Sequence, residues 1–245
     1  MATQGTDAQG AVLTAKDIAQ AIDHSLLRPD ITHDELLEGL RMAKRYGVAT
    51  CCVRPMDVPI AREELAGSVV RVSSVVGFPH GAHTTETKVF ETNNLIDLGA
   101  AELDMVLAFA RLKSGQDDYV YQDVKAVVDA AHARSVIVKV IIECFYLTDE
   151  EKVRACQICE EAGADYVKTS TGYSGGGATI EDVLLMRRSC SPKVAVKAAG
   201  GIRNLDATLR FLAAGAKMIG TRSTQAIMEE ALKREQEGTL RAVTL

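Results

Sequence analysis

The chain has 245 residues, of which 47% are hydrophobic and 25% are charged, and this composition is typical of a globular protein with one large core. Its net charge is −5 and it contains no basic block, which argues against nucleic acid as a partner. No apolar run approaches the roughly 20 residues that a membrane-spanning helix needs, so no membrane partner is expected.

The start of the chain is polar. Residues 1–12 contain no lysine or arginine and no apolar core, so they lack the features of a signal peptide and are expected to form a short disordered tail. The six cysteines show no disulfide or zinc spacing, and the pair Cys156 and Cys159 lies in an expected helix without a second pair. These features favour a reducing, cytoplasmic location.

Strand-like and helix-like segments alternate from residue 15 onward. An extra helix is expected near 14–21, and amphipathic helices are expected between the strands, for example over 34–47 and over 148–163. The second of these opens with a capping box formed by Thr148 and Glu151. Eight β-branched or continuously apolar runs, as in strands buried on both faces, cover 21–27, 48–53, 70–78, 101–107, 135–142, 165–170, 193–200 and 216–221.

Glycine followed by alanine recurs where a predicted helix leads into the next strand. Gly99, Gly163 and Gly215 occupy such positions, and glycine fits the left-handed conformation that often ends a helix. No linker rich in proline or serine divides the chain. The alternation predicts an α/β protein with a single (β/α)8 barrel over residues 13–245 and an extra N-terminal helix, with an open doubly wound sheet as the alternative.

Three lysines lie 29 residues apart. Lys139, Lys168 and Lys197 each lie inside an apolar, strand-like run. One strand, one helix and two loops take up such a length, so the spacing predicts three successive βα units with their ammonium groups at one level of the sheet. Burial and mutual repulsion lower the pKa values of clustered amines. A neutral amine is the nucleophile of Schiff-base chemistry, so these lysines are candidate catalytic residues.

Asp104 is a lone carboxylate inside another apolar strand. It is expected to compensate the charge of the lysines, to transfer protons, or to do both. His80 and His83 resemble a metal-binding pair only loosely, and without a third ligand nearby they predict no metal site.

Glycines follow the later predicted strands. They lie at 172 and 175–177, at 200 and 201, and at 220. Backbone N–H groups in such loops, next to helix N-termini, bind phosphate, and the loops after the seventh and eighth strands are the frequent phosphate location in these barrels. Ordinary turn formation is the alternative explanation for these glycines.

Two segments, DYVKTSTGY (165–173) and VAVKAAGGIR (194–203), are similar to the signatures of the deoxyribose-phosphate aldolase family. Further matches follow in family order between about residues 15 and 225: IDHSLL (22–27), VGFPHG (76–81), TETKVFET (85–92), ELDMVL (102–107) and VKVIIE (138–143). The resemblance implies a class I aldolase on a TIM barrel, without metal or cofactor. It also implies reversible cleavage of 2-deoxy-D-ribose 5-phosphate to D-glyceraldehyde 3-phosphate and acetaldehyde in deoxyribose phosphate catabolism, by a homodimer.

The resemblance also implies roles for individual residues. Lys168 would form the Schiff base, Lys197 would be the neighbouring cation that lowers its pKa and takes part in proton transfer, and Asp104 would donate and accept protons. Asp23 and Lys139 would belong to the surrounding polar network. The residues implied to bind the substrate's phosphate are Gly172, Gly200, Gly201, Gly220 and Ser223.

The chain departs from the family pattern at two places. The last phosphate loop of the family usually carries two adjacent serines, whereas this chain has Arg222 before Ser223. Arg222 would either add a cation to the phosphate site or point into solvent. Some members end in a tyrosine that assists proton transfer, but the last tyrosine here is Tyr173, so protonation is expected to rely on Asp104, Lys197 and water.

Other functions remain open on these residues. The nearest alternative is another Schiff-base aldolase, acting on a different sugar phosphate or a keto acid. An isomerase or epimerase would use Asp104 as a base and form no covalent adduct. A sugar-phosphate-binding barrel without activity would leave the three aligned lysines unexplained, and a zinc-dependent aldolase is disfavoured by the poor ligand set.

Overall fold

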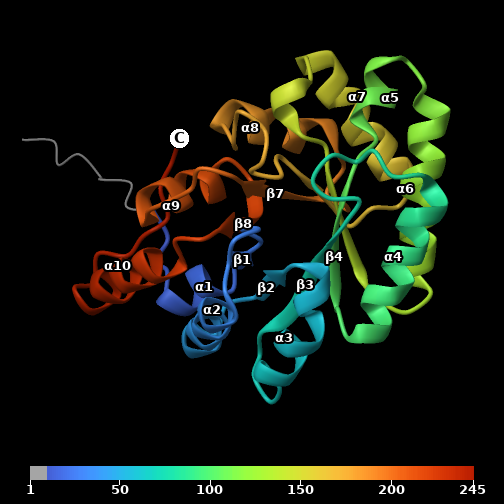
Figure 1. Ribbon diagram of the computed structural model, residues 1–245. Coiled ribbons are helices and arrows are strands. Elements are labelled where there is room, and N and C mark those ends of the chain that lie inside the picture. Colours follow the sequence, from blue (N-terminus) through green and yellow to red (C-terminus); the bar gives the residue numbers. More distant parts are fainter. Residues whose placement is uncertain (1–9) are drawn as a thin grey trace, which may run out of the picture.

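The structure, a computed structural model, describes residues 10–245 and contains a closed barrel (Figure 1). Its strands pair in parallel and in sequence order, and the last pairs with the first. They are β1 (Ile22–Leu26), β2 (Thr50–Val53), β3 (Arg71–Val76), β4 (Glu102–Val106), β5 (Ile137–Ile141), β6 (Tyr166–Lys168), β7 (Ala195–Ala199) and β8 (Ala216–Thr221). The predicted (β/α)8 barrel is confirmed, and closure excludes the open sheet.

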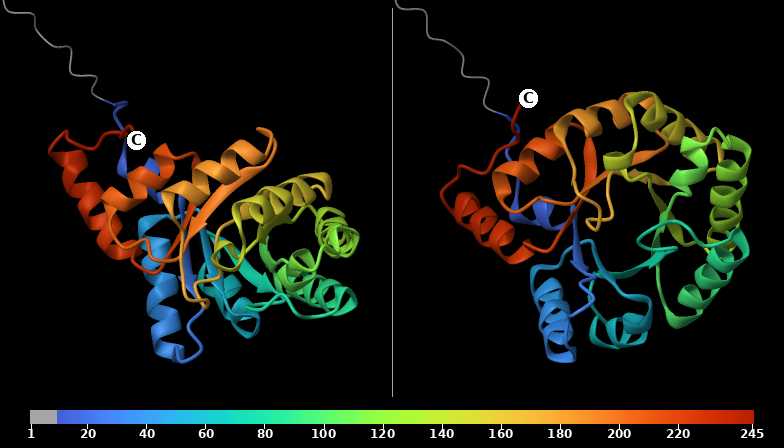
Figure 2. Two further views of the ribbon diagram at one scale, coloured as in Figure 1. Left: turned by 90° about the horizontal axis from the view of Figure 1, so that it is seen from above. Right: turned by 45° about the horizontal axis from the view of Figure 1, so that its top comes forward.

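Helices surround the barrel, as the right-hand view of Figure 2 shows. The expected extra helix is α1, which precedes β1. No helix within residues 10–245 combines the length and the apolar character needed to cross a membrane. The helices are α1 (Ala15–Ala19), α2 (His33–Tyr46), α3 (Val58–Glu64), α4 (Thr85–Leu98), α5 (Phe109–Lys113), α6 (Asp117–His132), α7 (Asp149–Glu161), α8 (Ile180–Ser189), α9 (Leu205–Ala213) and α10 (Thr224–Gln236), with short 3-10 turns η1 (Pro55–Asp57) and η2 (Cys144–Tyr146).

Local sequence signals explain where these helices begin and end. The predicted capping box of α7 is present, with the Thr148 side chain accepting from the Glu151 N–H and the Glu151 carboxylate accepting from the Thr148 N–H. Gly99, Gly163 and Gly215 have φ values of 116°, 88° and 100°, which glycine adopts without a steric penalty. The three helices before these glycines therefore end where the sequence predicts, and the chain turns back into the barrel.

The two ends of the described chain lie together. The Leu13 N–H donates to Leu240 O, the Ala242 N–H donates to Ala11 O, and Val12 forms an antiparallel bridge with Arg241. Residues 1–9 of the predicted tail fall outside the described residues. Within the described residues, Ala11 and Val12 pair with the C-terminal segment.

Strand register sets the depth of each inward-facing side chain. Lys168 of β6 lies opposite Lys197 of β7, so these two ammonium groups are at one level as predicted. Lys139 of β5 lies opposite Tyr166, two residues before Lys168, so its backbone is offset by two residues in the register. Strands in a closed barrel are staggered, and all three ammonium groups nevertheless reach Asp104.

Candidate active site

A cavity of about 460 Å³ opens at the C-terminal ends of β1, β6, β7 and β8. Its size is that of a site for a small organic ligand. Lys168, Lys197 and Asp23 reach it from the barrel interior. All of the predicted phosphate-binding residues also line it, which are Gly172, Gly200, Gly201, Gly220 and Ser223.

Asp104 lies at the centre of a buried charge cluster beneath this cavity. Its Oδ1 accepts from Lys139 Nζ at 3.0 Å. Its Oδ2 accepts from Lys168 Nζ at 2.7 Å and from Lys197 Nζ at 2.5 Å. The three lysines and the central carboxylate that the sequence singled out therefore meet in space. Asp104 and Lys139 are completely buried and lie outside the cavity lining.

The three lysines differ in their other partners. Lys139 also pairs with Glu102 Oε2 at 2.5 Å, and Lys197 also pairs with Asp23. Lys168 contacts one carboxylate, Asp104, among the described residues. Its side chain is 5% exposed, whereas those of the other two lysines are fully buried. Lys168 is thus the ammonium group with the least compensation and the most access to the cavity.

Opposing effects act on the ionisation of this cluster. Burial alone favours the neutral forms, but the ammonium groups of Lys139, Lys168 and Lys197 outweigh it and hold the pKa of Asp104 well below its usual range. For Lys197, burial is outweighed by Asp104 and Asp23, which raise its pKa. For Lys139, burial is outweighed in the same way, chiefly by Asp104, and its pKa is raised. These contacts therefore favour the charged forms of both lysines and of Asp104.

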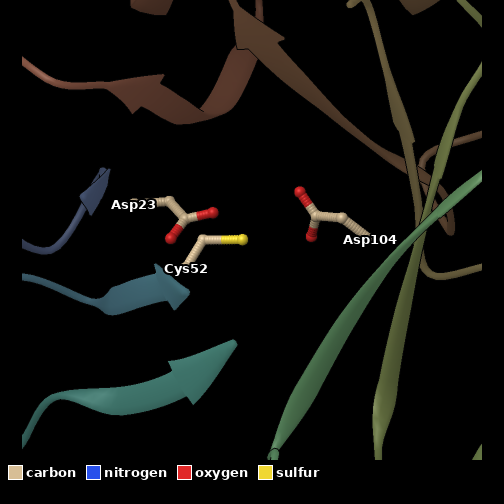
Figure 3. Close-up of side chains that lie close together, drawn as sticks. All are labelled: Asp23, Cys52 and Asp104. Carbon is tan, nitrogen blue, oxygen red and sulfur yellow. The ribbon is translucent and has the colours of Figure 1, made fainter. Parts of the chain in front are cut away.

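Asp23, Cys52 and Asp104 place potential metal ligands within 4.8 Å of one another (Figure 3). In Figure 3 the two aspartates approach each other from β1 and β4 across the barrel interior. However, Lys197 Nζ contacts both carboxylates, so an ammonium group already balances their charge. Burial, Asp23 and Asp104 raise the pKa of Cys52 to about 12, which keeps it a thiol. Asp23, Cys52 and Asp104 therefore suit the ammonium group of Lys197 better than a metal ion.

Other sequence candidates lie elsewhere. His80 and His83 are exposed and take part in no metal-like cluster of the described chain, and Cys156 and Cys159 are buried free thiols on α7. Cys51 belongs to the main hydrophobic core.

On the glycine-rich side of the cavity, a ligand can approach the backbone closely. Gly172 and Gly201 have positive φ, and no atom lies within 4 Å of where a Cβ would stand, so both face open space. A Cβ on Gly177 would lie 2.5 Å from Gly200 O, so the loops after β6 and β7 touch through their glycines. Thr221 Oγ1 donates to Ile202 O at 2.7 Å and links the loops after β7 and β8. These glycines serve the cavity as well as the turns.

Positive side chains complete the rim. Arg222, whose orientation the sequence left open, lines the cavity together with Arg28 and Arg203. Within residues 10–245 neither Arg203 nor Arg222 has a carboxylate within 4.0 Å, so both remain available to an anion. Sequence reasoning missed Arg28 and Arg203, although Arg203 ends the quoted VAVKAAGGIR segment.

The chain is similar to proteins of a known family. Residues 17–229 match the model of the DeoC/LacD family aldolases. A deoxyribose-phosphate aldolase of Geobacillus sp. (strain WCH70) is 53% identical over 213 residues, covering 87% of this chain and 95% of the relative.

Solved structures of known proteins are also similar to this chain. A putative deoxyribose-phosphate aldolase from Coccidioides immitis superposes with a TM-score of 0.86 at 38% identity, covering 93% of this chain and 92% of that one. A tetrameric deoxyribose phosphate aldolase from Aeropyrum pernix gives a TM-score of 0.82 at 32% identity, covering 89% and 92%.

Proposed function

Since this chain belongs to the DeoC/LacD family of aldolases, we propose that it reversibly cleaves 2-deoxy-D-ribose 5-phosphate to D-glyceraldehyde 3-phosphate and acetaldehyde. The observation that carries the proposal is the position of Lys168. Its Nζ reaches the cavity, contacts a single carboxylate and lies at the level of Lys197. Asp104 also pairs with Lys139 and Lys197, so its charge does not depend on Lys168 alone.

The reaction begins when neutral Lys168 attacks the aldehyde carbon of the open-chain sugar. Loss of water gives a protonated imine, which withdraws electrons from the adjacent bonds. Asp104 takes the proton of the C3 hydroxyl through a bridging water, the C2–C3 bond breaks, and glyceraldehyde 3-phosphate leaves. The remaining enamine takes a proton at C2, and hydrolysis releases acetaldehyde and free Lys168. General acid–base help of this kind contributes roughly 10²–10⁴-fold to the rate.

Proton transfer within the site follows the hydrogen bonds around Asp104 Oδ2. This oxygen accepts from both Lys168 and Lys197, so a proton can pass between these groups without crossing bulk water. Asp23 and Lys139 hold the cluster in place: Asp23 pairs with Lys197, and Lys139 pairs with Asp104. This arrangement supplies an internal route in a chain whose last tyrosine is Tyr173.

The phosphate of the substrate occupies the glycine-rich side of the cavity. Gly172, Gly200, Gly201 and Gly220 allow the ligand to approach the backbone, and Ser223 stands at the N-terminus of α10, where the helix dipole favours an anion. The exposed guanidinium of Arg222 adds a positive charge to the same side. The aldehyde end of the sugar then points down toward Lys168.

We further propose a homodimer in a reducing cytoplasm. The six cysteines, all within the described residues, are free, which supports a reducing compartment. Light scattering coupled to size exclusion is expected to give twice the chain mass of 26.3 kDa. A measured mass equal to one chain or to four chains would contradict the dimer.

The test is cleavage of deoxyribose 5-phosphate in EDTA, with acetaldehyde and glyceraldehyde 3-phosphate measured separately. Both products are expected in equal amounts, and EDTA is expected to have no effect. In the synthesis direction acetaldehyde should be the preferred donor. Preference for dihydroxyacetone or pyruvate would indicate a different Schiff-base aldolase. Conversion without bond cleavage would indicate an isomerase.

A further inference from the structure

Glu143 has an unusual backbone for its residue type. Its φ is 56°, and among residues 10–245 Ser135 is the other non-glycine residue with a positive φ. Its side chain is also buried, with 1% of the residue exposed. A non-glycine residue in this region is strained and persists only when its surroundings enforce it. Ser135 lies in the turn before β5, whereas Glu143 directly follows β5 on the side of the cavity.

The Glu143 carboxylate binds the loop that follows β6, residues 169–177, which we call the β6 loop. Its Oε2 accepts from the Thr171 N–H at 3.0 Å and from Thr171 Oγ1 at 2.5 Å. Thr171 Oγ1 in turn accepts from the Tyr173 N–H at 3.1 Å. Thr171 and Tyr173 both line the cavity. A buried carboxylate thus holds the chain at Thr171, in the wall of the cavity.

The backbone around Glu143 supports the same loop. The Ile142 N–H donates to Lys168 O at 3.0 Å, and the Cys144 N–H donates to Thr169 O at 2.8 Å. The left-handed turn at Glu143 interrupts this backbone pairing between the two segments. The Glu143 side chain then accepts a hydrogen bond from the Thr171 N–H. The ring of Phe145 lies against the end of the loop, because a Cβ on Gly175 would stand 2.7 Å from it.

We infer that Glu143 is a positioning residue that holds the β6 loop in the conformation that binds the substrate's phosphate. The inference rests on the proposed function, because it assigns the phosphate to the loop containing Gly172. The carboxylate faces neutral donors, and within the described chain no lysine, arginine or histidine nitrogen lies within 4.0 Å of it. Burial of an acidic group costs free energy, which the two hydrogen bonds from Thr171 to Oε2 partly offset. Its role is therefore acceptance of two hydrogen bonds from Thr171, which fix the loop above Lys168.

The test compares Glu143→Gly with Glu143→Gln. Glycine relieves the backbone strain and removes the whole side chain with its carboxylate, whereas the glutamine oxygen can still accept both bonds from Thr171. Ser135→Gly is the matched control, because it makes the same backbone change at φ 58° outside the cavity lining. Glu143→Asn is a second loss variant, since asparagine tolerates a positive φ but is one methylene too short to reach Thr171.

Two substrates separate positioning of the phosphate from general damage. In Glu143→Gly and Glu143→Asn, KM for deoxyribose 5-phosphate should rise about tenfold, while kcat/KM for unphosphorylated 2-deoxyribose stays within about twofold. Glu143→Gln and Ser135→Gly should resemble the wild type. An equal loss for both substrates, or an unchanged KM in both loss variants, would overturn the inference.

A binding measurement keeps this inference separate from the proposed function. The dissociation constant for inorganic phosphate, measured by calorimetry, should also rise about tenfold in Glu143→Gly and Glu143→Asn. If the wild-type protein binds phosphate but cleaves no sugar, the proposed function fails and the role of Glu143 still stands. If phosphate binds equally to all variants, the role of Glu143 fails whatever the activity is.

Discussion

A lysine becomes a nucleophile only after it loses its proton, and the three buried lysines differ in what that loss leaves behind. Deprotonation of Lys139 or of Lys197 would leave two carboxylates without one of their cationic partners. Deprotonation of Lys168 would affect Asp104 alone. Asp104 would still pair with the other two lysines. The geometry therefore singles out Lys168 by its partners as well as by its exposure.

Lys197→Leu is expected to move the acidic limb of the kcat/KM profile to higher pH. Without this cation the charge of Asp104 is shared by fewer partners, so Lys168 holds its proton more tightly. The variant should also lose stability, on the order of 3–5 kcal/mol, because Asp23 and Asp104 lose a buried partner. The measurement is the pH dependence of cleavage in folded variant protein, and an unmoved limb would remove Lys197 from this role.

Arg222→Ser is expected to weaken binding of the phosphorylated substrate about tenfold and leave kcat nearly unchanged, since a charge-assisted hydrogen bond is lost. Cleavage of 2-deoxyribose serves as the internal comparison and should not change. Arg210→Ser is a matched control, because this exposed arginine lies on α9 outside the cavity lining. Equal KM values for the wild type and Arg222→Ser would show that the guanidinium points into solvent during the reaction.

Packing between helices and strands depends on one buried ion pair. Lys88 of α4 donates to Asp123 of α6 at 2.5 Å and to Val106 O at 2.9 Å, at the end of the strand that carries Asp104. Burial lowers the pKa of Lys88, although Asp123 partly offsets this effect. The pair thereby links α4 and α6 to β4.

Lys88→Met is expected to reduce the free energy of unfolding by about 3–5 kcal/mol, because Asp123 would be left buried without its cation. The double variant Lys88→Met with Asp123→Leu should regain most of that loss. Urea denaturation measures both, and Lys125→Met, at an exposed pair on α6, is the control that should change little. If the double variant is no more stable than the single one, the buried charge is not the cause.

Most elements could be predicted because their signals are local. The capping box at Thr148 and the glycines that end the helices depend on residues next to one another in sequence. The register offset of Lys139 could not be predicted, because barrel stagger is a property of all the strands together. The role proposed for Glu143 could not be predicted for a similar reason, since its partner Thr171 lies 28 residues away. No local sequence pattern predicts a glutamate with a positive φ.

For the molecule as a whole, the buried cluster links stability to pH. The pKa of Asp104 is lower in the folded state than in the unfolded state, so its contribution is present above about pH 4 and is lost as pH falls further. Asp104→Asn should therefore be less stable than the wild type at neutral pH, with the difference narrowing below about pH 4. Urea titrations between pH 3 and 7, roughly the range set by the carboxyl pKa, test this. A difference that does not change with pH would contradict it.

A covalent imine between Lys168 and the substrate can be trapped by reduction. Borohydride is added during turnover of deoxyribose 5-phosphate in EDTA, followed by intact mass measurement and peptide mapping. A reduced two-carbon adduct is expected on Lys168 and none in Lys168→Ala. An adduct on Lys139 or Lys197, or no adduct on folded protein that binds the substrate, would contradict it.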